Sequence, residues 1–303
     1  MLFDVALLTK QSLLESDEGD WYKQQVHLED GLVVSALEKQ GLRVTRIAWD
    51  DAGFDWRQTR SLLFRTTWDY FERFSEFSPW LDQVSRQSRL FNSAELIKWN
   101  IDKHYLSTLA EKGLNTVVTH YIERGDPRTL SQCLQQTGWE DAILKPAISG
   151  SARHTYRLNM ACCQELECRF AELIQREGML LQPFQQQIQQ QGELSLMVID
   201  GRFSHAIRKT AKPGDFRVQD DHGGSVHAHQ ASQEEKDFAE AAVAILPFDV
   251  LYARVDIIRD NHGQLAIMEL EMIEPELFFR FRPEAADDLA AGLARRLKSQ
   301  SIV

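Results

Sequence analysis

Short apolar runs and one helical repeat alternate along the first third of the chain. Residues 3–8, 44–49 and 61–64 are apolar enough to form buried strands. After the first run, apolar side chains recur at the spacing of one helix face before Gly41: Leu28, Leu32, Val33, Ala36 and Leu37. This alternation predicts an open α/β layer that extends to about Asn92. Because no G-x-G-x-x-G pattern follows the first run, the layer lacks a dinucleotide fingerprint and is expected to hold substrate.

The pattern changes at Ser93. A longer helical repeat begins there, with apolar residues at Ala94, Ile97, Ile101, Leu106 and Leu109. Strand-like apolar runs follow around residues 117, 143 and 180. These features predict a second, smaller module over residues 93–182.

The last third of the chain indicates β-hairpins followed by a helix. Residues 194–199 and 202–208 flank an Asp200-Gly201 turn, and residues 251–258 and 265–271 flank a turn at residues 261–263. An amphipathic helix is marked by Leu289, Leu293 and Leu297. The glutamine-rich stretch 185–191 is expected to be an exposed loop. A third module therefore covers residues 183–303.

The composition is that of a globular protein too long for one small domain. Of the 303 residues, 43% are apolar and 26% are charged. Lys and Arg total 34 against 45 Asp and Glu, a formal net charge of -11, so no nucleic-acid partner is expected. Any phosphate site must therefore be local.

Neither a membrane span nor a disulfide framework is expected. No apolar run is long enough to cross a bilayer, and residues 1–10 lack the basic start of a signal peptide. We therefore expect a cytoplasmic protein without a membrane partner. The cysteines are too few to staple the chain and are expected to be reduced and structural: Cys133, Cys162, Cys163 and Cys168.

Two acidic strand segments near the C-terminus carry the most informative pattern. Glu269 and Glu271 are two residues apart and so share one face of a strand, and hairpin pairing can bring Asp256 onto that face. Converging carboxylates repel one another unless a hard divalent cation with oxygen ligands compensates their charge. The pattern favours a metal site, and a solvated strand face is the alternative.

A lysine and a loop of small residues follow the run at residue 143. Lys145 supplies a compact positive charge, and Ser149, Gly150 and Ser151 let backbone N–H groups approach phosphate oxygens. A simple turn is the alternative, because the loop does not match G-x-x-x-x-G-K-[ST]. Lys103, in a helical stretch, is by itself typical of a surface lysine.

Two further segments suit ligand binding. Gln182, Pro183 and Phe184 end an apolar run, where extended backbone can present N–H and C=O groups to the edge of a base. A strand terminated by proline is the alternative there. Arg208 and Arg217 belong to a basic cluster that can neutralise a phosphoryl group or a carboxylate, with a solvated strand end as the alternative.

Arg65 and Thr66 follow the run that ends at Phe64. The carboxyl ends of strands in α/β sheets commonly bind ligands. We therefore predict that Arg65 and Thr66 contact substrate, and the alternative is that this aromatic-rich segment belongs to the core.

These signals occur in the order found in ATP-grasp ligases. The chain resembles in particular the branch of the ribosomal-protein glutamate ligase and prokaryotic glutathione synthetase, with matching positions from Lys103 to Glu271. The resemblance implies an α/β fold with α+β character in the ATP-grasp part. An N-terminal substrate layer would cover residues 1–92, a central subdomain residues 93–182 and a C-terminal subdomain residues 183–303.

The resemblance also implies roles for single residues. Nucleotide contacts are implied at Lys103, Lys145, Ser149, Gly150, Ser151, Gln182, Pro183, Phe184 and Glu193. Arg208 and Arg217 are implied to act in catalysis. Metal ligands are implied at Asp256, Glu269 and Glu271, and the family usually carries Asn at the last position, which leaves the number of metal ions open.

Three segments are similar to a smaller branch, that of the O-ureido-D-serine cyclo-ligase of cycloserine biosynthesis: residues 65–70, 99–103 and 268–275. The resemblance implies ATP and Mg²⁺, with Mn²⁺ as an alternative metal. It implies an acyl phosphate formed on an amino-acid-like small molecule, followed by carboxylate-amine ligation or ring closure. A kinase-like ATP user and a nucleotide-binding regulator without turnover are the alternatives, and a homo-oligomeric state stays open.

Overall fold

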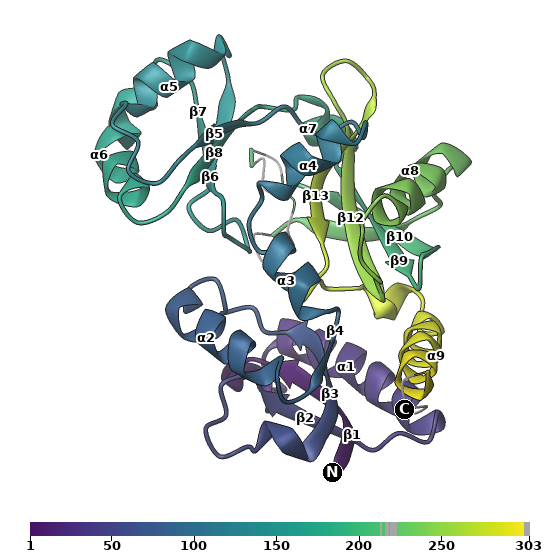
Figure 1. Cartoon of the computed structure of the whole chain (residues 1–303). Helices are drawn as coiled ribbons and strands as arrows, with labels where there is room; N and C mark the ends of the chain where they lie inside the picture. The colour runs from purple at the N-terminus through teal and green to yellow at the C-terminus, as the bar shows by residue number, and fades with distance from the viewer. Residues whose placement is uncertain (213, 216–217, 219–222, 300–303) are drawn as a thin grey trace.

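The computed structural model describes residues 1–212, 214–215, 218 and 223–299. Within these residues the strands form three sheets, one parallel sheet in the N-terminal layer and two antiparallel sheets beyond it (Figure 1). The predicted mixed fold class, α/β with α+β character, is confirmed. No helix in these ranges is both long and apolar enough to cross a membrane.

The N-terminal layer is built on a parallel sheet in the order β2-β1-β3-β4. Its strands are β1 (Phe3–Thr9), β2 (Val44–Ala48), β3 (Thr59–Thr66) and β4 (Arg89–Phe91), and the first three confirm the predicted strands. Alternate residues of β1 face opposite sides, so that Val5 packs toward α1 (Trp21–Lys39) and Ala6 toward α2 (Phe74–Val84). Short 3-10 turns at Gln11–Leu13 and Trp56–Gln58 complete the layer.

The middle sheet is antiparallel in the order β5-β8-β6-β7. Its strands are β5 (His120–Ile122), β6 (Ala142–Pro146), β7 (Tyr156–Leu158) and β8 (Met179–Pro183). Helices α5 (Leu130–Thr137) and α6 (Cys163–Ile174) share its hydrophobic core. Cys133 and Cys163 lie buried in that core as free thiols, which agrees with the structural role expected for cysteines here.

The large sheet has the order β11-β10-β9-β12-β13, and all its strand pairs are antiparallel. The strands are β9 (Glu193–Ile199), β10 (Arg202–Thr210), β11 (Ser225–His229), β12 (Tyr252–Arg259) and β13 (Leu265–Glu271). Both predicted hairpins are confirmed, including the Asp200-Gly201 turn, where both residues take positive φ.

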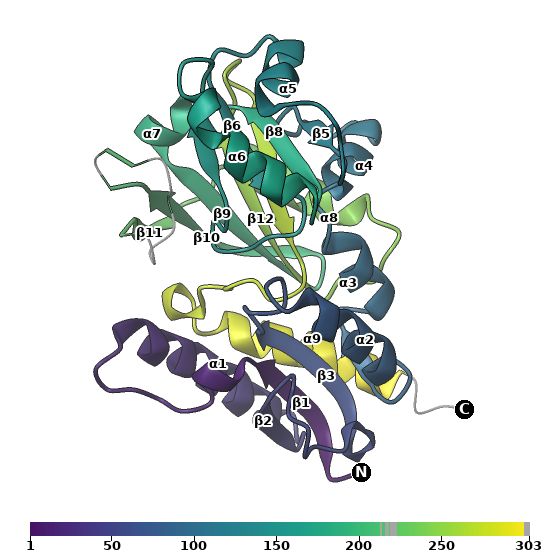
Figure 2. The same cartoon turned by 90° about the vertical axis from the view of Figure 1, so that its left-hand side faces the viewer.

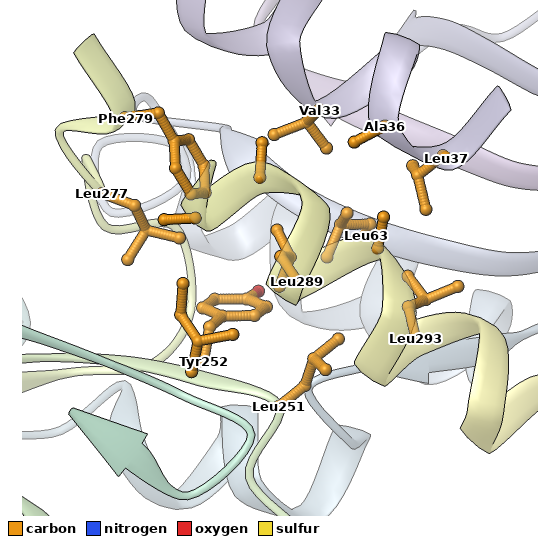
Figure 3. Close-up of a cluster of buried hydrophobic side chains, with 14 of the residues drawn as sticks. Val33, Ala36, Leu37, Leu63, Leu251, Tyr252, Leu277, Phe279, Leu289 and Leu293 are labelled. Atoms are coloured by element: carbon orange, nitrogen blue, oxygen red, sulfur yellow. The ribbon is translucent and has the colours of Figure 1, made fainter. Parts of the chain in front are cut away.

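The two faces of the large sheet are covered by different parts of the chain. Leu194, Leu196 and Val198 pack in one core with α3 (Ala94–Asn100), α4 (Tyr105–Glu111) and α8 (Gln233–Ala244). Met197 and Ile199, at alternate positions, belong to a core shared with α1 and α9 (Ala285–Lys298). Figures 1 and 2 show α9 lying against the N-terminal layer, and Figure 3 shows Leu289 and Leu293 of α9 in one cluster with Val33 and Leu37 of α1 and Tyr252 of β12.

The packing therefore groups segments differently from the boundaries expected at residues 92 and 182. Helix α4 follows the N-terminal layer in sequence but packs on the large sheet, and α3 contributes Leu96 to the core of the large sheet and Ile97 to that of the N-terminal layer. Helix α9 follows the large sheet in sequence but packs on the N-terminal layer. The reason is that each helix buries its apolar face where an uncovered sheet or helix face is available, and chain order does not specify that place.

Two local expectations were wrong. The repeat from Ser93 forms two helices, α3 and α4, separated by a turn that contains Lys103. The glutamine-rich stretch is not a loop throughout, because it forms the short helix α7 (Gln187–Gln191). Ile188 of α7 is buried against Val117 and Phe184, and this contact holds the segment to the protein.

His205 on β10 links the large sheet to the segment that follows β13. Its Nε2 donates to Leu277 O at 2.9 Å and Phe278 O at 3.2 Å, and burial lowers the pKa of His205 from 6.5 to about 4. The stability that neutral His205 contributes is complete above about pH 6.5 and is lost as the pH falls toward 4, since the unfolded chain binds the proton first.

Between pH 7 and pH 5 the free energy of unfolding should fall less in His205→Gln than in the wild type. The two falls should differ by on the order of 2 kcal/mol. Thermal unfolding at the two pH values measures the difference. His262→Gln changes an exposed histidine and should follow the wild type. Equal acid sensitivity of His205→Gln and the wild type would contradict the buried neutral histidine.

Candidate functional site

A cavity of about 590 Å³ lies where the three sheets approach one another. The N-terminal layer contributes Trp68 and Tyr70, the middle sheet contributes Lys145, and the large sheet contributes Asp256 and Glu269. This volume is typical of sites for small molecules, which are commonly ~300–1,000 Å³. Residues far apart in the sequence thus form one wall.

The β12–β13 hairpin turns a guanidinium and three carboxylates toward this cavity. Asp256 pairs with Glu269, and Arg254 pairs with Glu271, in cross-strand register. A β-bulge lies between Ile267, which faces the helix-covered core, and Glu269. The extra residue changes the side to which the following residues point, so that Glu269 and Glu271 line the cavity.

Each of these carboxylates has a positive partner. Arg254 forms ion pairs with Asp256, at 2.9 Å, and with Glu271, and Lys145 Nζ lies 2.8 Å from Glu269. Burial would raise the pKa of Asp256 and Glu269, but the neighbouring cations hold both pKa values at about 2. Burial raises the pKa of Glu271 to about 7, although Arg254 opposes this shift.

A second buried network joins β9, β10 and β12. Lys209 lies opposite Glu193 in register and forms an ion pair with it, and Lys209 Nζ is 3.4 Å from Asp256. The Ser195 hydroxyl donates to Asp256 as well. Burial raises the pKa of Glu193, and it would lower the pKa of Lys209, but the two carboxylates raise it. The network therefore keeps Lys209 charged inside the protein.

Two lysines approach Glu269 from different elements. Lys103, in the turn between α3 and α4, lies 3.8 Å from Glu269, while Lys145 comes from β6. Lys103 Nζ also donates to Ser149 O at 2.5 Å, which ties it to the loop of residues 149–153. Within this loop, a Cβ on Gly150 would lie 2.6 Å from the Phe71 ring. The loop therefore borders the cavity in close contact with the N-terminal layer.

The far end of the cavity is apolar. It is walled by Val117, Ile143, Phe184, Ile188 and Met268, and this set is called the apolar slot below. Gln182, also in the wall, donates through its side chain to Thr119 at 2.9 Å, and the Phe184 N–H donates to Asp141 O at 2.9 Å. Because the Phe184 N–H already has this partner, a flat heterocycle in the slot would depend mainly on apolar contact.

The cavity offers oxygen donors of the kind that Mg²⁺ prefers. In the part of the chain that the structure describes, no three His, Cys, Asp or Glu side chains gather closely enough to hold a metal by themselves. Mg²⁺ commonly takes one or two carboxylates and completes its shell with water and phosphate oxygens. Asp256 and Glu269 fit a metal of this kind, and Glu271, the third predicted ligand, lines the same cavity.

Arg208 does not line the cavity. It donates to Gln191 O and lies 3.4 Å from His229, on the opposite side of β10 from Lys209. Adjacent residues of a strand point to opposite faces, so only one of the two can reach the site. Lys209 takes the position expected for Arg208. Arg217, the other predicted catalytic residue, lies outside the described residues.

Arg65 and Thr66 also lie behind the cavity wall. Arg65 is 1% exposed, with its guanidinium 3.5 Å from Asp30 and 4.0 Å from Glu29. The Thr66 hydroxyl is 2.6 Å from that of Thr9. Both side chains point into the N-terminal layer. Their positions therefore do not support the predicted direct contact with substrate.

Among the wall residues that the sequence-based prediction did not assign to the site are Arg254, Lys209 and Glu274. Arg254 stands two residues before Asp256, a spacing that places both on one strand face. Lys209 belongs to the same basic cluster as Arg208, and the catalytic role was assigned to Arg208. Glu274, after the end of β13, lies in the stretch 268–275 that carries the resemblance, but no role was predicted for it, because the side to which it points depends on how the segment turns.

Two family models match different parts of the chain. The model described as the RimK-like ATP-grasp domain matches residues 109–277, which is more than half of the chain. The model described as the N-terminal domain of D-cycloserine synthetase DcsG matches residues 5–92. The matched ranges correspond to the two antiparallel sheets and the N-terminal layer.

Individual relatives extend these matches over the chain. The cycloserine biosynthesis protein DcsG of Streptomyces lavendulae is 27% identical over 284 residues, 88% of this chain and 93% of that protein. The crystal structure of D-cycloserine synthetase DcsG has a TM-score of 0.83 at 25% identity, covering 97% of this chain and 99% of that one. A probable alpha-L-glutamate ligase of Parasynechococcus marenigrum is 32% identical over 181 residues, 59% of this chain and 37% of that protein.

Lys209 and Arg208 are neighbouring cations on opposite faces of β10, so replacing each in turn tests which of them faces the cavity. Lys209→Met should lower the free energy of unfolding by about 3–5 kcal/mol, because it leaves the buried Glu193 without its cation and removes one of the two cations beside Asp256. Arg208→Met removes the same charge from the other face and should cost no more than about 1 kcal/mol. Urea unfolding of both variants measures the contrast, and equal losses would rule out the inward position of Lys209.

Proposed function

The chain belongs to the RimK-like ATP-grasp ligases, and we propose that it activates a substrate carboxylate as an acyl phosphate, which an amine then displaces. ATP would supply the phosphoryl group, and ADP and phosphate would be the by-products. The observation that carries this proposal is the cavity itself, in which two lysines, a buried arginine and paired carboxylates meet beside the apolar slot.

Nucleotide binding follows from the two ends of the cavity. The apolar slot suits adenine, with Gln182, Pro183 and Phe184 along its edge. Lys103 and Lys145 suit the phosphates, because both are compact cations directed at the same carboxylate and gain partners when phosphate oxygens arrive. The remaining proposed nucleotide contacts are Ser149, Gly150, Ser151 and Glu193.

Asp256, Glu269 and Glu271 would hold Mg²⁺, which when bound neutralises phosphate charge and orients the phosphoryl group. Arg254 lies among these carboxylates and carries a permanent charge. It is suited to stabilising the negative charge on the transferring group, the role first expected of Arg208.

The proposed reaction has two displacements. A carboxylate oxygen of the substrate attacks the γ-phosphorus, and the bond to ADP breaks. An amine nitrogen then attacks the acyl carbon and loses a proton, and phosphate leaves with the electron pair of the C–O bond. The loop of residues 149–153 and the buried walls would exclude water, which otherwise hydrolyses the acyl phosphate.

The substrate is proposed to be a small amino-acid derivative. Support comes from the match of the N-terminal layer to the DcsG N-terminal domain and from similarity along 93% of the cycloserine biosynthesis protein. Whether the amine belongs to a second molecule or closes a ring depends on the walls of the cavity beyond the nucleotide.

Amino-acid-dependent release of ADP and phosphate from Mg-ATP tests this function. A panel of amino acids and small peptides should contain at least one compound that stimulates both products. A kinase-like enzyme would release ADP without phosphate, and a regulator would bind ATP without releasing either.

Glu269→Gln should reduce stimulated phosphate release by about 100-fold or more, because it removes the carboxylate between both lysines and the proposed metal. Circular dichroism should show the fold retained. Glu111→Gln, at an exposed position on α4, serves as the control and should keep wild-type turnover. Undiminished release from Glu269→Gln at saturating Mg²⁺ would refute the role of this residue.

A further inference from the structure

Glu274 differs from the other buried carboxylates of the cavity wall, because among the described residues no Lys or Arg forms an ion pair with it. Six other carboxylates of its wall each contact a Lys or Arg: Asp69, Glu193, Asp256, Glu269, Glu271 and Glu276. Glu274 is half-buried in the same wall. Within the described residues its carboxylate has no ion pair, and the hydrogen bond found for it comes from its own backbone N–H. Glu72, also in the wall, is exposed to water and needs no such partner.

The backbone around Glu274 is held on several sides. Trp68 Nε1 donates to Glu274 O at 2.9 Å, and Arg65 donates to Pro275 O at 3.4 Å. The Tyr252 hydroxyl donates to Ile273 O at 2.7 Å. These donors come from the N-terminal layer and from β12, so the carboxylate is presented by a fixed segment. Arg65 thus contributes to the cavity by positioning this segment.

The surroundings of Glu274 suit an organic cation. Trp68, which contacts its backbone, and Tyr22 form an aromatic pair with centroids 5.8 Å apart, and both line the cavity. Aromatic faces attract ammonium groups. Burial and the nearby Glu271 raise the pKa of Glu274 to about 8, so an added positive charge would stabilise its ionised form.

We propose that the carboxylate of Glu274 receives the ammonium group of the amino-acid substrate and makes a free amine a requirement for binding. This inference rests on the proposed function, because it concerns the substrate of the same site. A divalent cation fits less well beside Glu274, because it needs several oxygen ligands. The neighbouring Trp68 and Tyr22 supply no carboxylate oxygens. A nucleotide phosphate is excluded by its charge.

Calorimetry on the full chain with Mg²⁺ and a non-hydrolysable ATP analogue tests the inference without turnover. The titrants are the L and D forms of the common amino acids, followed by the N-acetyl derivative of each one that binds. The wild type should bind the free amino acid at least about 10-fold more tightly than its N-acetyl form, as expected for loss of a charge-assisted hydrogen bond.

Glu274→Gln should weaken binding of the free amino acid by about 10- to 100-fold while leaving the N-acetyl derivative and the ATP analogue nearly unaffected. Glu274→Asp keeps the charge and should keep the preference for a free amine. Glu72→Gln removes the same charge from an exposed position and should change affinity by less than about threefold.

Wild-type affinity in Glu274→Gln, or equal losses for the free and acetylated forms, would overturn the inference. If amino acids bind in this way but never stimulate phosphate release, the proposed function fails while the inference stands. If the wild type binds none of these titrants, the inference fails, and the release of ADP and phosphate decides the proposed function separately. Unchanged affinity for the ATP analogue in each variant shows that the fold and nucleotide site remain intact.

Discussion

A buried carboxylate needs a positive charge beside it, and the cavity is arranged around this requirement. Asp256 and Glu269 stay ionised because Arg254, Lys209 and Lys145 are within ion-pair distance. The cations come from separate elements, so charge balance depends on how the sheets are placed. The contact of Lys145 with Glu269 joins the middle sheet to the large sheet.

The N-terminal layer is integral to this arrangement. Helix α9 packs on α1 in a core that also contains residues of the large sheet, so α9 holds the N-terminal layer against that sheet. Arg65, buried beside Glu29 and Asp30, reaches the backbone at Pro275. The segment after β13 is therefore fixed by both parts of the molecule. This connection holds Glu269, on β13, and Glu274, just after it, at the wall of the same cavity.

Much of the fold was predictable because the signals are local. Apolar periodicity located β1, the hairpins of the large sheet and α9, since burial of one face imposes a period on the sequence. The short strands β4 and β7 were not foreseen, because three residues are too few to establish a period. The strand predicted around residue 117 lies a few residues later in the chain, as β5. In the site, Lys103 illustrates the limit: the sequence placed it within a helix, whereas the break between α3 and α4 lets it reach Glu269.

The sequence by itself determined which residues of a strand share a face, and the spacing of Glu269 and Glu271 is an example. It did not determine which face meets the cavity. That choice was made by tertiary structure: α4 and α8 cover one side of the large sheet, which leaves Lys209 inside and Arg208 outside. A β-bulge before Glu269 made the same kind of choice on β13. The physical reason is that alternation is a property of one strand, whereas inside and outside exist only once other elements have packed against it.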